Sequence, residues 1–510
     1  MLAARPLPGR FTVTAGVLLV ALLAALFFIS ARKSPAFDET GDISAGLSYI
    51  QFGEVRANLQ HPPLLKELAG LSLWLGGYRL PDTPELREAL TAGREREIGS
   101  QFLAANGPDR ALFLARLPFL LLTVLLGALI FLWGRQLLGE AAALAALAIY
   151  ALDPIILGHG HLATMDVGLA AFVVLFFFTL WNYLEQPTPL RMALCGVTLG
   201  LMLCAKFSAI FLLPVAMLLM RRAGWLAWAV MAAVASVMVQ AAYLSPGGLF
   251  LYVSGLQRVN LDHNPDYLVF LGGEFAHNFP AYFPVAYLLK EPLAAIALVG
   301  LGCVAVRGTA RIILLGAPVL VFAAHIIFAD DLGVRYLIPA LPFLQLLGGA
   351  AFVWLFRSGI PGRVAATTLG VWLAFAAWGV APDHLSYFNE AAALTKDAAC
   401  LGRDGGSACG PRWLDDSNVD WGQSLLQVRE WAAQNAPGQR LHLAYFGSFP
   451  PTAYGLNAEP YEPGTQTPAV GLYLVSAHYV ARAPRASWIS RAQPSQVIGH
   501  AMYVYRVALR

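Results

Sequence analysis

Charge is scarce in this chain. Only 13% of its 510 residues are Asp, Glu, Lys or Arg, whereas 58% are hydrophobic, and the mean hydropathy is +0.60. A soluble globular domain carries about 25% charged residues, so this composition excludes an ordinary soluble domain. We expect a polytopic α-helical membrane protein.

An excess of positive charge is also missing. The 34 Lys and Arg residues exceed the 31 Asp and Glu residues by only three, and they are dispersed among apolar segments. Proteins that follow a nucleic-acid backbone carry a basic stripe or patch. No nucleic-acid partner is therefore expected.

Cysteine is rare, with five residues. Cys195, Cys204 and Cys303 lie within or beside apolar segments, where a thiol behaves as a small apolar side chain. Cys400 and Cys409 lie in a more polar region and would form a disulfide in an oxidising compartment. From the sequence alone, a disulfide and two free thiols are both possible states of this pair.

Long apolar runs are abundant instead. A membrane-spanning helix needs about 20 apolar residues, and the sequence predicts eleven such segments, near 11–30, 112–134, 141–157, 167–184, 192–205, 207–220, 225–244, 283–305, 312–329, 336–356 and 364–381. The two on either side of Lys206 are short. The first run is longer than the roughly 7–15 residues of a secretory signal core, so we expect it to remain as a span.

The positive charges predict an orientation. If the N-terminus is cytoplasmic, every inside connection is basic, as the positive-inside rule requires; the residues concerned are Arg5, Arg10, Arg135, Arg191, Arg221, Arg222, Arg307, Arg311, Arg357 and Arg363. Four pieces are then outside: the loop 31–111, the loop from His159 to Asp166, the loop 245–282 and the chain after 382. We expect a bacterial inner-membrane protein whose periplasmic face carries the function.

Residues 382–510 differ in character from the membrane part, 1–381. Pro, Gly, Asp and Arg become frequent, and Ser424 to Gln434 has the pattern of an amphipathic helix. Segments 441–446, 470–475 and 500–508 have the composition of strands. The sequence thus predicts a small C-terminal α/β domain outside the membrane.

Two charged motifs lie in the first outer loop. Phe37-Asp38-Glu39 follows the first span, and His61-Pro62-Pro63-Leu64-Leu65-Lys66-Glu67 comes later in the same loop. Charges beside a membrane span are costly and mark functional sites. The structural alternative is that an acidic residue caps a helix beginning near Asp42, and that the prolines only start the next helix.

These motifs resemble the protein O-mannosyltransferases and the wider glycosyltransferase family 39, which has the GT-C fold. Further similarity is found at Met165-Asp166, at Tyr287-Leu288-Leu289-Lys290-Glu291-Pro292 and at Arg335-Tyr336-Leu337-Ile338-Pro339. The chain has no room for the large β-trefoil insertion of the eukaryotic mannosyltransferases. Its Tyr387-Phe388-Asn389-Glu390 and Asp416-Ser417-Asn418-Val419-Asp420-Trp421-Gly422-Gln423 look like a bacterial branch.

The resemblance implies an inverting transfer of a sugar from a polyprenyl-phosphate carrier to a protein, lipid or glycan hydroxyl outside the membrane. Such chemistry needs a carboxylate to accept the hydroxyl proton and cations to stabilise the departing phosphate. The resemblance implies that Asp38 is this base, with Glu39 as the runner-up. Asp166 is expected to face Asp38 and orient the acceptor, or to cap its own helix.

Four cations are candidates for the donor phosphate: Lys66, Lys206, Lys290 and Arg335. Arg grips a phosphate with two hydrogen bonds, and Lys offers a compact charge. The alternative for a basic residue near a helix end is snorkelling towards the lipid headgroups.

Substrate contacts are expected from His61, His159, His161 and Tyr336. The pair His159 and His161 also invites a metal interpretation, but residues two apart point to different faces of a helix. The resemblance implies that no cofactor is required, and a divalent metal remains the lesser alternative. A structural role for the histidines is open as well.

Other functions stay open at this point. A polytopic transporter or flippase of a lipid-linked envelope precursor is the main alternative, although no internal repeat of the kind common in transporters is visible. A ligase that moves a whole glycan from a lipid pyrophosphate and a non-catalytic scaffold are two more. The particular sugar is not predicted, because discrimination among hexoses depends on a few scattered hydrogen bonds.

Overall fold

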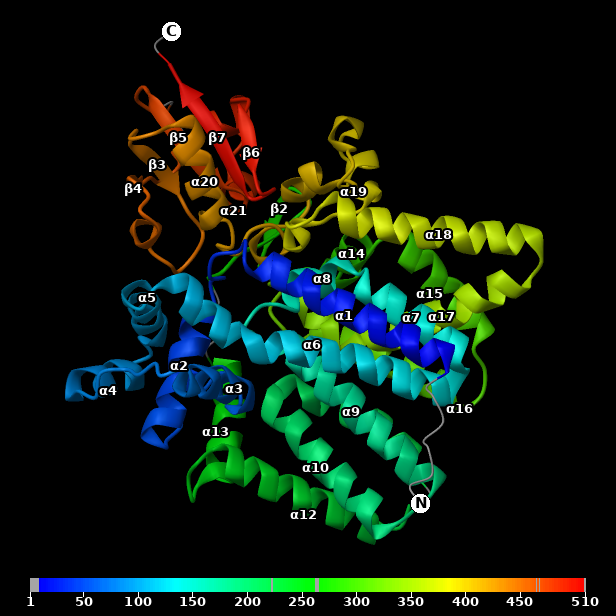
Figure 1. The fold of residues 1–510 in the computed structure, drawn as a ribbon. Coiled ribbons are helices and arrows are strands. Elements are labelled where there is room, and N and C mark those ends of the chain that lie inside the picture. The colour runs from blue at the N-terminus through cyan, green and yellow to red at the C-terminus, as the bar shows by residue number, and fades with distance from the viewer. Residues whose placement is uncertain (1–8, 222, 262–265, 465, 467, 509–510) are drawn as a thin grey trace, which may run out of the picture.

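The computed structural model describes residues 9–221, 223–261, 266–464, 466 and 468–508. Helices dominate, and a small sheet near the C-terminus lies at one end of the helical bundle, opposite the start of α1 (Figure 1). This arrangement confirms the prediction of a polytopic helical protein with a C-terminal α/β domain. Arg5, Arg222 and residues 262–265, which belong to the predicted connections, lie outside the described residues.

Seven helices of the described part are long and apolar enough to cross a membrane. They are α1 (Arg10–Ser30), α6 (Pro108–Leu138), α9 (Met165–Glu185), α12 (Trp225–Ala242), α16 (Thr309–Phe328), η2 (Val334–Ala340) continued by α17 (Leu341–Arg357), and α18 (Ile360–Gly379). The pair α14 (Tyr282–Lys290) and α15 (Leu293–Ala305) is long and apolar enough to form an eighth span or a re-entrant loop, and its two axes differ by 113°.

Shorter apolar helices occupy the other predicted spans: α7 (Glu140–Ala151), α10 (Pro189–Ala205) and η1 with α11 (Phe207–Leu212 and Leu213–Leu219). All eleven predicted segments are therefore largely helical, and several of them are short or interrupted by breaks. Prolines explain two of the breaks, because the residue before a proline avoids the helical conformation. Glu291 before Pro292 and Asp153 before Pro154 are both extended.

Surface helices of the first loop are α2 (Glu39–Phe52), α3 (Leu64–Leu75), α4 (Pro84–Thr91) and α5 (Glu95–Ala105). Helices α2 and α3 approach so closely that a Cβ on Gly46 would lie 1.9 Å from the Lys66 carbonyl oxygen. A Cβ on Gly99 in α5 would lie 1.8 Å from the Thr40 carbonyl oxygen. Glycine at these positions thus fixes α2 against its neighbours.

Two further helices and a hairpin complete the membrane part. Helix α8 (Pro154–His159) precedes α9, and α13 (Gly248–Leu261) follows α12. The hairpin pairs β1 (Val269–Leu271) with β2 (Glu274–Ala276) in antiparallel register. The aromatic core lies between α6, α9 and α17, where the buried Trp133 ring contacts Phe177 and Phe343 at centroid distances of 6.5 and 6.0 Å.

The C-terminal domain contains a five-stranded sheet of order β4-β3-β5-β7-β6. The strands are β3 (Leu441–Ala444), β4 (Ala458–Pro460), β5 (Gly471–Ser476), β6 (Gln496–Ile498) and β7 (Met502–Val507), with β3 parallel to β4 and β5, and β7 antiparallel to β5 and β6. The three predicted strands are confirmed. Strands β4 and β6, three residues each, were not predicted because they are too short to show an alternating pattern.

The helices of this domain are α19 (Glu390–Leu394), α20 (Leu425–Asn435), α21 (Ala477–Arg482) and α22 (Trp488–Arg491). Short 3₁₀ turns connect them: η3 (His384–Ser386), η4 (Ala398–Cys400), η5 (Ser407–Arg412), η6 (Asp416–Asn418) and η7 (Pro451–Tyr454). Helix α20 confirms the predicted amphipathic helix. Cys400 and Cys409 form a disulfide, while Cys195 and Cys204 are free and buried.

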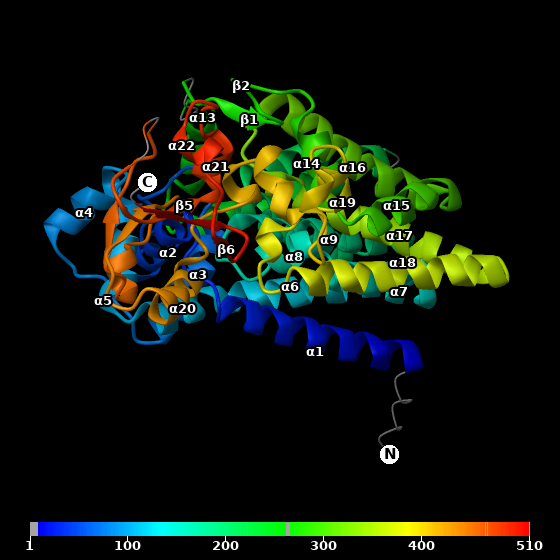
Figure 2. The same ribbon diagram turned by 90° about the horizontal axis from the view of Figure 1, so that it is seen from above.

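Seen from above, α1 runs along one side of the bundle, and the C-terminal domain covers α2 at the end of the bundle (Figure 2). The first loop, the segment around Asp166, the β1–β2 hairpin and the C-terminal domain all contribute residues to one cavity at this end. These are the four pieces that the charge pattern assigned to a common face.

Candidate functional site

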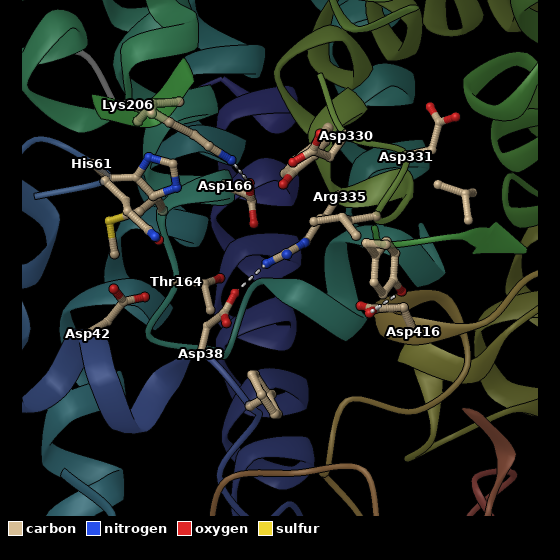
Figure 3. Close-up of a pocket in the computed structure, with 18 of the residues that line it drawn as sticks. Asp38, Asp42, His61, Thr164, Asp166, Lys206, Asp330, Asp331, Arg335 and Asp416 are labelled. Carbon is tan, nitrogen blue, oxygen red and sulfur yellow. Dashed lines mark hydrogen bonds and ion pairs between the residues drawn. The ribbon is translucent and has the colours of Figure 1, made fainter. Parts of the chain in front are cut away.

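A cavity of about 550 Å³ lies where these segments meet (Figure 3). It is lined by Phe37, Asp38, Asp42, Gln60, His61, Arg96, Thr164, Met165, Asp166, Lys206, Val259, Tyr267, Val269, His277, Asp330, Asp331, Leu332, Arg335, Tyr336 and Asp416. Of the predicted site residues, the structure brings Asp38, His61, Asp166, Lys206, Arg335 and Tyr336 together here. The remaining predicted residues do not line the cavity.

Asp38 stands at the start of α2 with its carboxylate in the cavity. Its side chain makes no capping hydrogen bond to the helix, so the capping alternative does not apply. Asp38 Oδ2 accepts a hydrogen bond from Arg335 Nη1 at 2.9 Å, and Oδ1 lies 3.6 Å from a guanidinium nitrogen of Arg96. With 32% of its side chain exposed, Asp38 is accessible to a ligand.

A second ion pair is formed by Asp166 and Lys206. Lys206 Nζ donates to Asp166 Oδ1 at 2.7 Å, and both side chains are buried. Helix α10 ends just before Lys206, whose extended backbone carries the side chain inward, and its ammonium lies 4.5 Å from the Tyr336 ring centroid. Lys206 therefore faces the cavity and does not snorkel.

Asp42 and His61 line the cavity on the side of the first loop. Asp42 is one turn after Asp38 on α2 and accepts from Asn58 Nδ2 at 3.1 Å. Burial raises the pKa of Asp42 to about 7, although Lys66 opposes the shift. Burial and the charges of Lys206 and Lys66 lower the pKa of His61 well below its ordinary value, so the imidazole is neutral.

Two polar atoms on this wall have no hydrogen-bond partner among the described residues. They are Thr164 Oγ1 and His61 Nδ1. Buried polar groups are normally hydrogen-bonded, and an orphan near a cavity indicates a ligand or water partner. These atoms are suited to the hydroxyl groups of a sugar.

The opposite wall of the cavity is acidic, as Figure 3 shows for Asp330, Asp331 and Asp416. Burial raises the pKa of Asp331 and of Asp416 to about 6 each, and Arg335 opposes the shift at Asp416. Sequence reasoning did not single out Asp330 or Asp331, and it named Asp416 only as part of a motif and not as a site residue. The adjacent acids Asp330 and Asp331 at the end of an apolar segment were the signal that could have pointed to them.

The structure corrects the prediction that Glu39 belongs to the site. Its carboxylate is fully buried, pairs with Arg116 at 2.6 Å and accepts backbone N–H groups of Ala36 and Ala163. Arg116 also donates to the carbonyl oxygens of Ser30, Lys33 and Ser34. Glu39 does not line the cavity, so its placement is that of a structural anchor for the turn before α2.

Two lysines expected at the donor phosphate are also placed elsewhere. Lys66 Nζ donates to the carbonyl oxygens of Asn58, at 2.5 Å, and His61, at 3.1 Å. Lys290 Nζ donates to those of Leu385, at 2.7 Å, and Asn418, at 2.5 Å. Both side chains are buried and hold loops together. Backbone carbonyl oxygens accept the hydrogen bonds of each ammonium group in the place where a phosphate was expected.

His159 and His161 are likewise away from the cavity. Both are buried; the His159 ring meets Trp421 edge to face at 6.2 Å, and His161 Nδ1 lies 3.2 Å from the Leu157 carbonyl oxygen. Their expected substrate contacts need correction, since these residues pack between elements. Within the described ranges, no group of three or more His, Cys, Asp or Glu is arranged to hold a metal ion, and metal independence stays a prediction.

Several solved structures are similar to this chain, among them the following three. ArnT from Cupriavidus metallidurans in the apo state is 14% identical, over 96% of this chain and 97% of that chain, with a TM-score of 0.49. The same protein bound to undecaprenyl phosphate is 15% identical, over 97% and 98%, with a TM-score of 0.44. The Saccharomyces cerevisiae Pmt1-Pmt2 complex bound to its sugar donor is 17% identical, over 52% and 36%, with a TM-score of 0.33.

No curated protein sequence matches the chain. Residues 109–253, from the start of α6 into α13, match the family described as dolichyl-phosphate-mannose-protein mannosyltransferase. This segment includes Met165-Asp166, which contributed to the resemblance seen in the sequence, but it lies outside the first-loop motifs that contributed most to it. Over these residues, the match confirms the resemblance to the protein O-mannosyltransferases that the sequence suggested.

Proposed function

We propose that the protein is an inverting glycosyltransferase that moves a sugar from a polyprenyl-phosphate carrier to a hydroxyl acceptor. The observation that carries this proposal is the contact of Asp38 with Arg335 in the cavity. It puts a carboxylate that can accept a proton beside a cation that can bind a phosphate. The family match over residues 109–253 supports the reaction class.

The donor phosphate would lie against Arg335 and Lys206. Arg335 offers a planar fork for two phosphate oxygens, and Lys206 offers a point charge. Since Arg335 donates to Asp38, a donor phosphate would compete with Asp38 for the guanidinium.

In the transfer step, the acceptor oxygen attacks the anomeric carbon on the face opposite the phosphate. Its proton goes to Asp38, and the bond between the anomeric carbon and the phosphate oxygen breaks. The electron pair stays on the phosphate, which leaves as polyprenyl phosphate while Arg335 and Lys206 neutralise its charge. Attack from the opposite face inverts the anomeric centre.

The sugar itself would contact the cavity wall on the side of the first loop. The neutral His61, the Asp42 carboxylate and the Thr164 hydroxyl offer donors and acceptors there. We further propose that the site faces the periplasm of a bacterial inner membrane, that a protein, lipid or glycan supplies the hydroxyl, and that Asp166 orients it. No cofactor takes part in this step.

The alternative of a transporter or flippase fits less well. Transporters bind their substrates near the bilayer midplane, whereas Asp166 and Arg335 stand in the first turns of their helices and Lys206 at the end of α10. These three residues share the cavity with Asp416 of the C-terminal domain. An enzyme acting at the membrane surface needs its charges there.

The test is transfer from radiolabelled polyprenyl-phosphate sugars to periplasmic extract by the purified full chain. We expect Asp38→Asn to lose about 10²–10⁴-fold in rate, because Asn keeps the shape but cannot accept the proton. Asp82→Asn is the matched control, since Asp82 is an exposed first-loop aspartate paired with Arg87. An active Asp38→Asn variant would overturn the assignment of the base; movement of the donor across vesicles without any transfer would favour the transporter.

A further inference from the structure

The turn that carries Asp38 is held by the C-terminal domain. Phe37 N–H donates to the Trp421 carbonyl oxygen at 2.8 Å, and the Phe37 carbonyl oxygen accepts from Ser448 Oγ at 2.8 Å. Both backbone polar groups of the residue before Asp38 are thus bonded to a segment far along the chain. Three residues earlier, Ser34 N–H donates to the Gln423 carbonyl oxygen at 3.1 Å.

Ser448 joins three parts of the first loop. Its single hydroxyl proton goes to the Phe37 carbonyl, so the Thr40 hydroxyl, 2.9 Å away, must donate to Ser448 Oγ. The Ser448 carbonyl oxygen also accepts from Ser100 Oγ on α5 at 2.9 Å. Ser448 therefore ties together the two residues, Phe37 and Thr40, that flank the acidic pair.

A column of planar groups runs through the same contact. The Arg96 guanidinium lies 4.4 Å from the centroid of the Phe37 ring, Phe37 stacks on Phe446 at 5.4 Å, and Phe446 stacks on His478 at 3.9 Å. His478 Nδ1 accepts the Asp416 N–H at 3.3 Å. The column thus extends from Asp38, beside Arg96, to Asp416 on the opposite wall of the cavity.

This support matters because the turn that carries Asp38 has little regular structure of its own. Residues 33–36 have neither helix nor strand structure, and on its other side the turn is held by Arg116. A reacting group must be held to within about 0.5 Å of its productive position, and a misplacement of about 1 Å costs on the order of 100-fold in rate. The C-terminal domain supplies contacts that could meet this requirement.

We propose that Ser448 and Phe446 are positioning residues for Asp38, so that the C-terminal domain sets the geometry of catalysis. This inference rests on the proposed function, in which Asp38 is the base. Neither residue lines the cavity, so neither contacts the donor or the acceptor. Ser448 reaches the reaction through the turn that carries Asp38, and Phe446 reaches it through Phe37 and also through His478, which contacts Asp416.

Steady-state kinetics of the full chain test the proposal. We expect Ser448→Ala and Phe446→Leu each to lower kcat by about tenfold with an unchanged KM for the donor, because the donor contacts are intact. Ser448→Thr, which keeps the hydroxyl, should recover most of the rate. Ser487→Ala is the matched control, since Ser487 is a buried serine of the same domain that donates to the Gly464 carbonyl oxygen.

Hydrogen exchange gives a readout that does not depend on activity. The Phe37 amide should exchange faster in Ser448→Ala than in the wild type or in Ser487→Ala, while the melting temperature stays within the spread of the control. Unchanged kcat, or a fall in kcat that Ser448→Thr does not recover, overturns the positioning role. If the wild type transfers no sugar, the proposed function fails, and unchanged exchange at Phe37 would separately overturn the coupling of the domain to the turn.

Discussion

Arg335 donates to Asp38 Oδ2 across 2.9 Å, although the two residues are 297 positions apart in the chain. The same guanidinium lies 4.1 Å from the Trp421 ring centroid. Arg335 thus connects the first loop, the start of the η2–α17 span and the C-terminal domain at one point. The site exists only when these three parts are assembled.

Replacement of Arg335 by Lys should weaken the use of the donor. Lys keeps the charge but loses the planar fork, and a lost charge-assisted hydrogen bond costs about 1.5–3 kcal/mol, which corresponds to about 10–100-fold in kcat/KM. The measurement is kcat and KM for the donor. Arg87→Lys, at an exposed pair with Asp82 and Glu54, should change neither; a wild-type KM and kcat in Arg335→Lys would contradict the phosphate role.

Glu39→Gln should destabilise the fold. The change leaves the Arg116 charge buried without its partner, and removal of one member of a buried pair costs about 3–5 kcal/mol. Thermal unfolding in detergent measures this, with Glu97→Gln on the exposed face of α5 as the control. A Glu39→Gln protein with wild-type stability and no transfer would restore Glu39 as a candidate base.

The two buried lysines Lys206 and Lys290 should behave differently when changed to Met. Lys206→Met removes the partner of Asp166 in the cavity, so we expect a large loss of transfer. Lys290→Met leaves two buried carbonyl oxygens without a donor, at about 1–3 kcal/mol each, and should lower the melting temperature. A raised donor KM in correctly folded Lys290→Met would show that Lys290 reaches the phosphate after all.

The stability of the C-terminal domain should depend on pH through His500. His500 Nδ1 lies 2.9 Å from Asp383 Oδ2, and Nε2 lies 3.1 Å from Asp404 Oδ2. Burial alone lowers the pKa of His500, but the hydrogen bonds and charges of Asp383 and Asp404 outweigh it and raise the pKa to about 9. In the unfolded chain the imidazole titrates near 6.5.

The charged imidazole therefore stabilises the fold fully below about pH 6.5, and this contribution is lost as the pH rises through about 9. We expect a loss of about 1–3 kcal/mol over this window. Thermal unfolding at several pH values measures it. The loss should be absent in His500→Gln and present in His442→Gln, whose partner Glu459 lies on the neighbouring strand; a pH-dependent loss of equal size in His500→Gln would refute the assignment.

The membrane-spanning helices were predictable because length and apolar composition are local properties of the chain. The breaks were harder to place. Pro154 and Pro292 are visible in the sequence, yet a proline within a long apolar run is often tolerated in a span. Pro118 in α6 and Pro318 in α16 lie inside continuous helices, so only packing distinguished these cases.

The candidate site was predictable in part for a similar reason. Asp38, His61, Asp166, Lys206, Arg335 and Tyr336 were singled out by the family resemblance and by their position beside apolar segments, and all six line the cavity. The sequence did not reveal which neighbour each would meet. Lys66 belongs to the same motif as His61, but its ammonium donates hydrogen bonds to backbone carbonyl oxygens, whereas His61 lines the cavity.

The amino-acid sequence by itself determined that this is a helical membrane protein with a C-terminal α/β domain and an acidic motif after its first span, because composition, run length and short motifs carry that information. Only the tertiary structure decided which charges share a cavity. Asp38 and Glu39 are adjacent, but successive side chains at a helix start point about 100° apart. One therefore meets Arg335 in the cavity, and the other meets Arg116 in the interior.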